Sequence, residues 1–456
     1  MRDLTQGSIA AHLLGMAAFI GISLIFQTLY FIVDLYFVSR LGNAAIAGVS
    51  ASGNVFFLAL AASQLISIGA MATVSQAVGR KDEAEANLFS DQAISMSLLF
   101  GAVMLALGYA FGGPGVDALT ADAASAAAGR AYLFAFLPQL ALMFPVAAMT
   151  SALRGAGVTM PTMVLQTATI ILNVILAPVL IAGWGTGVAL GVAGAGLASS
   201  ISALLGTIAL VFMFPRVQTY LRLHVDRLAP KLNAWRRLTF IGLPTSLEFL
   251  MMFAIFIVIY FVIRDFGAEA QAGFGIGGRI MQSIFLPAMA ISFAAAPIAG
   301  QNFGAKRYDR VRETFKVTAI IGSGIMLTAS LLCHINPSLL ARPFTNDPAV
   351  LAVSDEYLRI VSWNFVFSGL VMAAGSLFQG MGDTRPSLLA SATRMATFVA
   401  PVLWMSTQPW FALEHVWLLS VGSVIAQCAL AMWLLFRTFD RKLAAPALAP
   451  IAAAAN

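Results

Sequence analysis

The segment GAGVTMP, Gly155 to Pro161, recurs as GMGDTRP, Gly380 to Pro386, which lies 225 residues further along the chain (380 − 155). The same offset places LTAD, Leu119 to Asp122, on FTND, Phe344 to Asp347. It also pairs small and polar residues of the two halves: Gly42 with Gly267, Gly48 with Gly273, Gly53 with Gly278, Gln76 with Gln301, Gly79 with Gly304, and Lys81 with Lys306. One offset of 225 residues, without gaps, therefore aligns positions from Gly42 to Pro161 with positions from Gly267 to Pro386. Such a long match indicates an internal duplication.

The composition places the chain in a membrane. Of its 456 residues, 60% are hydrophobic and 10% are charged, and the mean hydropathy is +0.87. A soluble globular protein has about 25% charged residues. Because one crossing needs about 20 apolar residues, the chain has room for about a dozen helices and for no large soluble domain.

Apolar segments predict twelve transmembrane helices, at residues 9–38, 44–76, 87–111, 128–153, 160–182, 189–214, 236–263, 270–300, 314–334, 351–379, 386–407 and 413–436. The 225-residue offset carries the first six onto the last six, so both halves enter the membrane in the same direction. The sequence therefore predicts an all-α integral membrane protein with two pseudo-symmetric six-helix bundles around an axis along the membrane normal. Two such bundles enclose a cleft, and rocking one bundle on the other could open this cleft alternately to the two sides of the membrane.

The expected domain order is an N-terminal bundle at 1–214, a cytoplasmic linker at 215–235, a C-terminal bundle at 236–443 and a disordered tail at 444–456. Basic residues set the expected orientation. With both termini in the cytoplasm, nineteen of the 26 Lys and Arg residues lie inside and five outside. This bias is typical of multi-pass membrane proteins, whose cytoplasmic loops carry the positive charge.

Several function classes are excluded by the pattern of reactive residues. The net charge is +6, but the basic residues lie in short loops rather than on one exposed face, so no nucleic-acid partner is expected. Cys333 and Cys428 lie in apolar stretches and are expected to be inert thiols. The four histidines are scattered, and no metal-ligand spacing or phosphate-binding loop occurs. We expect no enzyme activity, no metal and no cofactor, and an ion gradient as the energy source.

Asp34 stands in the apolar run FQTLYFIVDLYFVSRLG, Phe26 to Gly42. An ionised Asp at the centre of a membrane helix costs roughly 2.5 to 3.5 kcal/mol, so it usually has a partner or a function. Gln27 and Tyr30 lie seven and four residues before it and share its helix face. One interpretation is a hydrated acid near Arg40. The polar face favours the other, a buried carboxylate that gains and loses a proton, because burial disfavours its charged form.

Two further polar sites are candidates. Gln166, Thr169 and Asn173 form a second stripe, which could bond a carboxylate, bind a small cation or join helices structurally. Glu248 follows Pro244 by four residues and could bind a cationic substrate, or pair with Arg279 or Arg394. Met251 and Met252 beside it suit an adaptable cavity wall, and we assign Gln166, Thr169, Glu248, Met251 and Met252 to substrate binding.

The sequence resembles the multidrug and toxic compound extrusion (MATE) transporters of prokaryotes from Leu4 to about Phe436. The resemblance is carried by four stretches: VDLYFVSRLGNAAIAGVS (Val33 to Ser50), GVAGAGLASS (Gly191 to Ser200), AAAPIAGQNFGAKRYDRVR (Ala294 to Arg312) and LFQGMGDTRPSL (Leu377 to Leu388). It implies a fold of two six-helix lobes and cation-coupled drug export. It also implies ion-coupling roles for five residues: Gln27, Tyr30, Asp34, Asn173 and Ser199.

Three departures from the family pattern bear on the coupling ion. Many relatives have an acid four residues after the asparagine, where this chain has Ala177. The helix-seven glutamate of relatives lies about two turns after the proline, whereas Glu248 lies one turn after it, and the stretch Phe365 to Gly369 lacks the usual acid. Arg279 and Arg394 look like basic positions with structural roles in relatives. Because these departures leave fewer oxygen ligands for a sodium ion, they favour the proton as the coupling ion.

Taken together, these features predict a monomeric antiporter of the bacterial inner (plasma) membrane that exports amphipathic or cationic drugs in exchange for protons. Sodium coupling is one alternative. A second is a lipid-linked oligosaccharide flippase of the same superfamily, although its pyrophosphate substrate should need an arginine-lined cleft, and the predicted helices contain only Arg279 and Arg394. A third, a membrane-embedded enzyme acting on lipids, lacks a credible nucleophile.

Overall fold

The computed structural model describes residues 3–216 and 221–443. Within these ranges the side chains of residues 31, 32, 34, 35 and 225 are not described. The predicted tail at 444–456 and part of the predicted linker, 217–220, therefore lie outside the described residues.

Helices make up the described chain almost entirely. The first half contains α1 (Ile9–Ser39), α2 (Asn43–Gly79), α3 (Glu83–Leu119), α4 (Ala123–Gly155), α5 (Met160–Ala182) and α6 (Gly191–Met213). The second half contains α7 (Leu232–Ile263), α8 (Ala268–Gly304), α9 (Tyr308–Ile335), α10 (Pro337–Ala341), α11 (Pro348–Val361), α12 (Asn364–Gly380), α13 (Arg385–Met405) and α14 (Leu413–Lys442). Two short 3-10 turns, η1 (Val225–Arg227) and η2 (Arg264–Phe266), flank α7.

Eleven of the described helices are long and apolar enough to cross a membrane. The pair α11 and α12, bent by 54°, makes a twelfth crossing if it counts as one span. The all-helical membrane fold is thus confirmed, but the helix predicted at 351–379 is bent. The Ser330 hydroxyl of α9 donates to the Ser362 carbonyl at the bend, over 2.9 Å, and so compensates the interrupted helical pattern.

The duplication extends to backbone detail. The bounds of α8 are those of α2 shifted by 225 residues. Lys81 and Lys306, one repeat apart, both adopt the left-handed conformation, with φ of 61° and 59°. Asp122 caps α4 and Asp347 caps α11, each accepting a backbone N–H at 2.8 Å, which explains the recurrence of LTAD as FTND. A hydrogen bond from the Ser125 backbone N–H, and a weaker contribution from the Ser125 hydroxyl, hold the pKa of Asp122 below its usual value.

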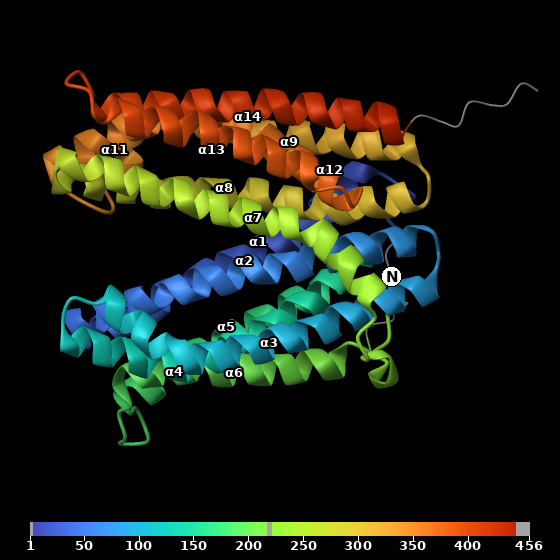
Figure 1. The fold of residues 1–456 in the computed structure, drawn as a ribbon, viewed down its shortest axis with the longest axis horizontal. Coiled ribbons are helices and arrows are strands. Elements are labelled where there is room, and N and C mark those ends of the chain that lie inside the picture. The colour runs from blue at the N-terminus through green and yellow to red at the C-terminus, as the bar shows by residue number, and fades with distance from the viewer. Residues whose placement is uncertain (1–2, 217–220, 444–456) are drawn as a thin grey trace, which may run out of the picture.

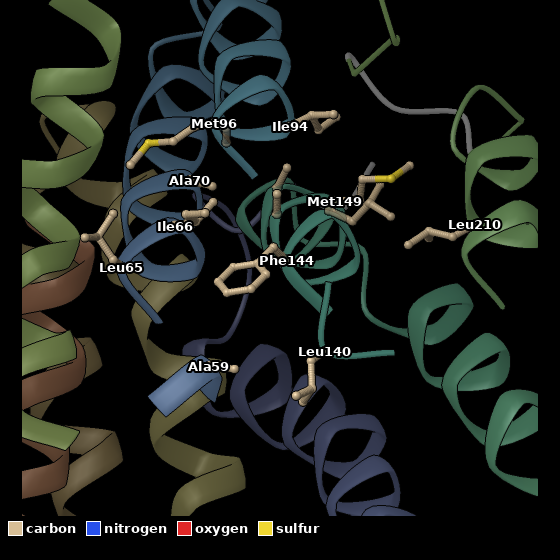
Figure 2. Close-up of a cluster of buried hydrophobic side chains, with 14 of the residues drawn as sticks. Ala59, Leu65, Ile66, Ala70, Ile94, Met96, Leu140, Phe144, Met149 and Leu210 are labelled. Atoms are coloured by element: carbon tan, nitrogen blue, oxygen red, sulfur yellow. The ribbon is translucent and has the colours of Figure 1, made fainter. Parts of the chain in front are cut away.

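The helices form two groups in Figure 1, with α2 to α6 in one and α7 to α14 in the other. The groups lie close together at the end where α2, α4 and α6 finish, and spread apart toward the opposite end. We call the end where the two groups lie close together the linker end. A buried apolar cluster joins α2, α3, α4 and α6, and Figure 2 shows Ile66, Ile94, Phe144 and Leu210 within it.

Helix α1 connects the two groups. Its first turns bury Leu13, Met16 and Ile20 against Ala294 and Ile298 of α8. It also packs on α5 and α6, where Tyr30 in its later turns bonds to Ser199 of α6. A displacement of α1 is therefore felt in both halves of the molecule.

Repeat-related contacts close the linker end. Gln76 Nε2 of α2 donates to the Gly380 carbonyl, and Gln301 Nε2 of α8 donates to the Gly155 carbonyl, both over 2.9 Å. Adding 225 to 76 and to 155 gives 301 and 380, so the two bonds are pseudo-symmetric copies. The backbones also approach closely here, because a Cβ added to Gly79 would lie 2.0 Å from the Gln301 carbonyl oxygen.

The segment before α1 adds a third contact at this end. Leu4 is fully buried, its N–H donates to Gln301 Oε1 over 3.1 Å, and its carbonyl accepts from Asn302 Nδ2 over 3.1 Å. Arg307 donates to the Thr5 carbonyl over 2.7 Å. The Gln301 amide thus ties the N-terminal segment, α8 and α4 together.

Candidate functional site

Three polar side chains, one each from α1, α5 and α6, meet in a hydrogen-bonded group. The hydroxyls of Tyr30 and Ser199 share a hydrogen bond of 2.6 Å. Asn173 Nδ2 donates to Ser199 Oγ over 3.1 Å. We call Tyr30, Asn173 and Ser199 the Ser199 hub, since the serine hydroxyl is the atom common to both bonds.

Small residues on α6 allow the hub to form. A Cβ added to Gly194 would lie 2.4 Å from the Leu180 carbonyl oxygen of α5, and one added to Gly196 would lie 2.6 Å from the Tyr132 carbonyl oxygen of α4. The backbone of α6 therefore runs against both neighbours. This close approach brings the short Ser199 side chain within reach of Asn173 and leaves both residues 2% exposed.

The hub contains one further hydrogen-bond acceptor. Asn173 Oδ1 is buried and has no hydrogen-bond partner among the described residues. Leaving such an oxygen unpaired in an apolar interior costs about 1 to 3 kcal/mol. Ala177, one turn further along α5, is fully buried and offers no side-chain oxygen. The hub can therefore accept one more donor, from a protonated group or a ligand.

Asp34 lies one helical turn after Tyr30 on α1. Its side chain is outside the described part of the structure, so its contacts are not assigned. The backbone alone places it on the same face as Tyr30, because residues four apart are neighbours on a helix.

The remaining residues of the two predicted stripes are less closely associated. Gln27 is half-buried on α1, and Gln166 is exposed on α5. The Thr169 hydroxyl donates to the Leu165 carbonyl of its own helix over 2.9 Å and lies against Gly206 of α6. Of the predicted stripe on α5, Asn173 alone takes part in the hub.

Glu248 is on α7, in the other half of the molecule. Its Oε1 is buried and has no hydrogen-bond partner in the described residues, although the Ser387 hydroxyl of α13 is close enough to interact with the carboxyl group. The alternative ion pair with Arg279 or Arg394 is not formed within the part of the chain that the structure describes.

The methionines next to Glu248 differ in exposure. Met252 is 48% exposed and Met251 is partly buried. One residue further on, the Phe253 ring stacks on Phe57 of α2, with the centroids 5.2 Å apart. This stretch of α7 therefore carries flexible and aromatic apolar surface at the boundary between the two groups of helices.

Sequence reasoning missed the reciprocal bonds of Gln76 and Gln301. Both residues stood out in the repeat, and the offset also pairs their partners Gly155 and Gly380. That coincidence was the available signal, but a repeat alone does not show that a side chain from one half reaches the backbone of the other.

Comparison with known proteins gives a consistent picture. The sequence pattern of the MatE family matches residues 20–179 and 244–405. The probable multidrug resistance protein NorM of Thermotoga maritima is 24% identical, over 90% of this chain and 88% of the relative. The multidrug export protein MepA of Staphylococcus haemolyticus is 23% identical, over 91% and 90%.

Solved structures share the fold. A MOP superfamily transporter from Pyrococcus furiosus, described as having a binding pocket of reverse polarity, superimposes with a TM-score of 0.89. It is 20% identical in sequence, and the match covers 96% of this chain and 98% of that one. The arrangement of helices described above is therefore shared with a transporter of low sequence similarity.

Proposed function

Because the chain belongs to the MATE family, we propose that it is a secondary antiporter that exports amphipathic or cationic organic compounds in exchange for protons by alternating access. Family membership makes it a multi-pass membrane transporter and not an enzyme. The observation that carries the coupling proposal is the Ser199 hub with its unused Asn173 oxygen.

Proton coupling is assigned to Asp34 and the hub beside it. Protonation neutralises the carboxyl group and turns one of its oxygens from an acceptor into a donor. A protonated Asp34 on α1 could donate a hydrogen bond to Asn173 Oδ1. An ionised Asp34 would instead accept hydrogen bonds from the Tyr30 and Ser199 hydroxyls. Gaining or losing one proton would therefore change how α1 is held against α5 and α6. Gln27 is assigned to the same polar face of α1.

Helix α1 is suited to transmit this change. Its first turns are packed on α8 of the second half, and its later turns carry Tyr30 of the hub. A ligand shifts a conformational equilibrium only by its difference in affinity for the two states. We infer that the proton and the drug favour opposite arrangements of the two halves.

Drug binding is assigned to Glu248, Met251, Met252, Gln166 and Thr169. A buried carboxyl group beside flexible methionines suits cations of varied shape, because the charge attracts and the thioethers adapt. The relatives NorM and MepA are named for multidrug resistance and multidrug export, which supports this substrate class.

Protons are favoured over sodium for a structural reason. A sodium site wants several hard oxygen ligands, and the position one turn after Asn173 is the fully buried Ala177. We further propose that the linker end faces the cytoplasm of a bacterial cell, with both termini inside, because the loops there carry most Lys and Arg residues.

Dye transport in everted membrane vesicles tests the function. We expect ethidium uptake after a pH jump without sodium, and its loss in Asp34→Asn at equal membrane content. Uptake that needs a sodium gradient and ignores the pH jump would overturn proton coupling. Vesicles that transport no organic cation under either gradient would overturn the drug assignment.

A further inference from the structure

A groove of about 630 Å³ lies between α9 and α14 near the linker end. Arg312 and Lys316 on α9 and Asp440 on α14 line it. Its apolar lining includes three phenylalanines whose ring centroids are 6.1 to 6.3 Å apart: Phe315, Phe436 and Phe439. The groove is open to the surroundings of the helices, since Ile320 and Phe436 are 62% and 53% exposed.

Charge and apolar surface are separated along the groove. Arg312 and Lys316 are near the first turns of α9, at the linker end, and Ile320 is one turn further along the helix. At 1.5 Å per residue, Arg312 and Ile320 are about 12 Å apart along the axis. With the linker end at the cytoplasmic membrane surface, as proposed above, the basic groups are at the level of the lipid headgroups and the apolar wall is at the level of the acyl chains.

The charged residues of the groove lack a counter-ion within the part of the chain that the structure describes. Among the described residues, neither Arg312 nor Lys316 forms an ion pair, and Asp440 forms none either. Two positive charges and one negative charge leave an excess of one positive charge. The groove is therefore complementary to an anion that carries an apolar chain.

In the first half of the molecule, the linker covers the corresponding face of α3. Four side chains of α3 bond to the backbone of the linker, namely Asn87 to Arg222, Asp91 to His224, Gln92 to Lys231 and Ser95 to Leu228. The 225-residue offset pairs three of these with groove residues: Asn87 with Arg312, Asp91 with Lys316, and Ser95 with Ile320. Basic and apolar residues in the second half thus replace the polar ones that hold the linker.

We propose that the groove between α9 and α14 binds one anionic phospholipid. The phosphate lies between Arg312 and Lys316, and an acyl chain follows Phe315, Ile320 and Phe436. Basic pockets between helices at the cytoplasmic side are the usual sites of anionic headgroups. Asp440 accepts a hydrogen bond from a headgroup hydroxyl, which favours phosphatidylglycerol.

Native mass spectrometry of the purified full chain, titrated with phosphatidylglycerol, tests the proposal. We expect the double variant Arg312→Gln, Lys316→Gln to bind the lipid at least about tenfold more weakly, because each basic group contributes about a fivefold factor. The matched control is Arg437→Gln, Arg441→Gln, which removes the same charge from α14 outside the groove and should change the affinity less than twofold. Equal losses in the two double variants would overturn the site.

Three further binding measurements identify which molecule occupies the groove. Phosphatidylcholine should bind at least about tenfold more weakly than phosphatidylglycerol, and millimolar inorganic phosphate should not displace the lipid. Ala319→Trp, which fills the groove without changing charge, should also weaken binding. Equal binding of phosphatidylcholine, displacement by phosphate, or unaltered binding to Ala319→Trp would contradict the proposal.

The chain after residue 443 is the competing occupant. A variant that ends at Leu443 should bind phosphatidylglycerol with the affinity of the full chain. Lipid binding that is seen only after this truncation would show that the tail fills the groove, and would overturn the lipid assignment.

Discussion

Two serines three residues apart on α6 have different surroundings. The Ser199 hydroxyl joins Tyr30 and Asn173, whereas the buried Ser202 hydroxyl has no partner among the described residues. Ser199→Ala removes two hydrogen bonds and leaves a buried amide unpaired, at a cost of about 2 kcal/mol. We expect at least a tenfold lower rate of pH-driven dye export, measured at equal expression.

Ser202→Ala is the control for this prediction. It makes the same chemical change one turn further along α6 and should alter stability by no more than about 0.5 kcal/mol. Similar transport defects in the two variants would argue against a specific role of the hub.

Glu248→Gln tests the division of labour between the two halves. The substitution keeps the shape of the side chain and removes its charge, so the preference among cationic and neutral drugs should change while export still follows the pH gradient. Competition between two substrates of different charge, measured in the same vesicles, reports the preference. Complete loss of ion-driven export would place coupling in the second half instead.

Sequence patterns pointed to two of the three members of the hub but not to its geometry. Tyr30 and Asn173 were identifiable because each lies on a polar face within an apolar helix. Ser199 came from the family resemblance alone, since a single serine in an apolar helix gives no pattern. The unused oxygen of Asn173 depends on how closely α6 approaches α5, which no single-helix periodicity contains.

Helices α2 and α8 touch through glycines. Ala at Gly79 or Gly304 would place a Cβ about 2 Å from a carbonyl oxygen of the other helix, so the helices must separate. We expect each substitution, Gly79→Ala and Gly304→Ala, to destabilise the protein by about 1 to 3 kcal/mol. Thermal unfolding in detergent, followed by size-exclusion chromatography, measures the effect.

Gly53 and Gly278 provide a control at the same repeat spacing. A Cβ at either position meets no atom within 4 Å. Ala should be neutral or slightly stabilising there, because Gly in a helix costs up to about 1 kcal/mol relative to Ala. Equal destabilisation at all four glycines would show that the close approach of α2 and α8 is not the cause.

The reciprocal glutamine bonds hold the linker end closed. Replacing both residues, Gln76→Leu and Gln301→Leu, removes about 1 kcal/mol per bond and should favour opening at this end. A cysteine at the buried Ala72 of α2 should then react with a water-soluble thiol reagent at least about fivefold faster. Gln427→Leu, which breaks a bond between α14 and Ser391 of α13 in the same half, should not increase the rate.

The positions of the helices followed from hydropathy and the repeat, because each is set by local sequence. The bend between α11 and α12 did not, since no proline marks it. Helix α4, the repeat counterpart of this bent pair, contains Pro138 and Pro145 and is nevertheless continuous. The carbonyl at the bend accepts a hydrogen bond from Ser330 of α9, a tertiary contact that the sequence of the bent segment cannot reveal.

For the whole molecule, the duplication predicted two bundles of the same direction, and the two groups of helices in Figure 1 correspond to the two halves of the repeat. The repeat could not predict where the halves differ. The N-terminal segment bonds to Gln301 and Asn302, whereas the counterpart chain before α7 bonds to α3. These differences arise because the segment that precedes α1 and the segment that precedes α7 differ.

Proton release on drug binding tests the coupling account most directly. Purified protein in weakly buffered detergent solution receives a cationic drug, and a pH indicator reports the protons released. We predict that the wild-type protein releases about one proton for each drug bound, and that Asp34→Asn binds the drug without releasing any. Drug binding without proton release by the wild type, or equal release by Asp34→Asn, would contradict the account.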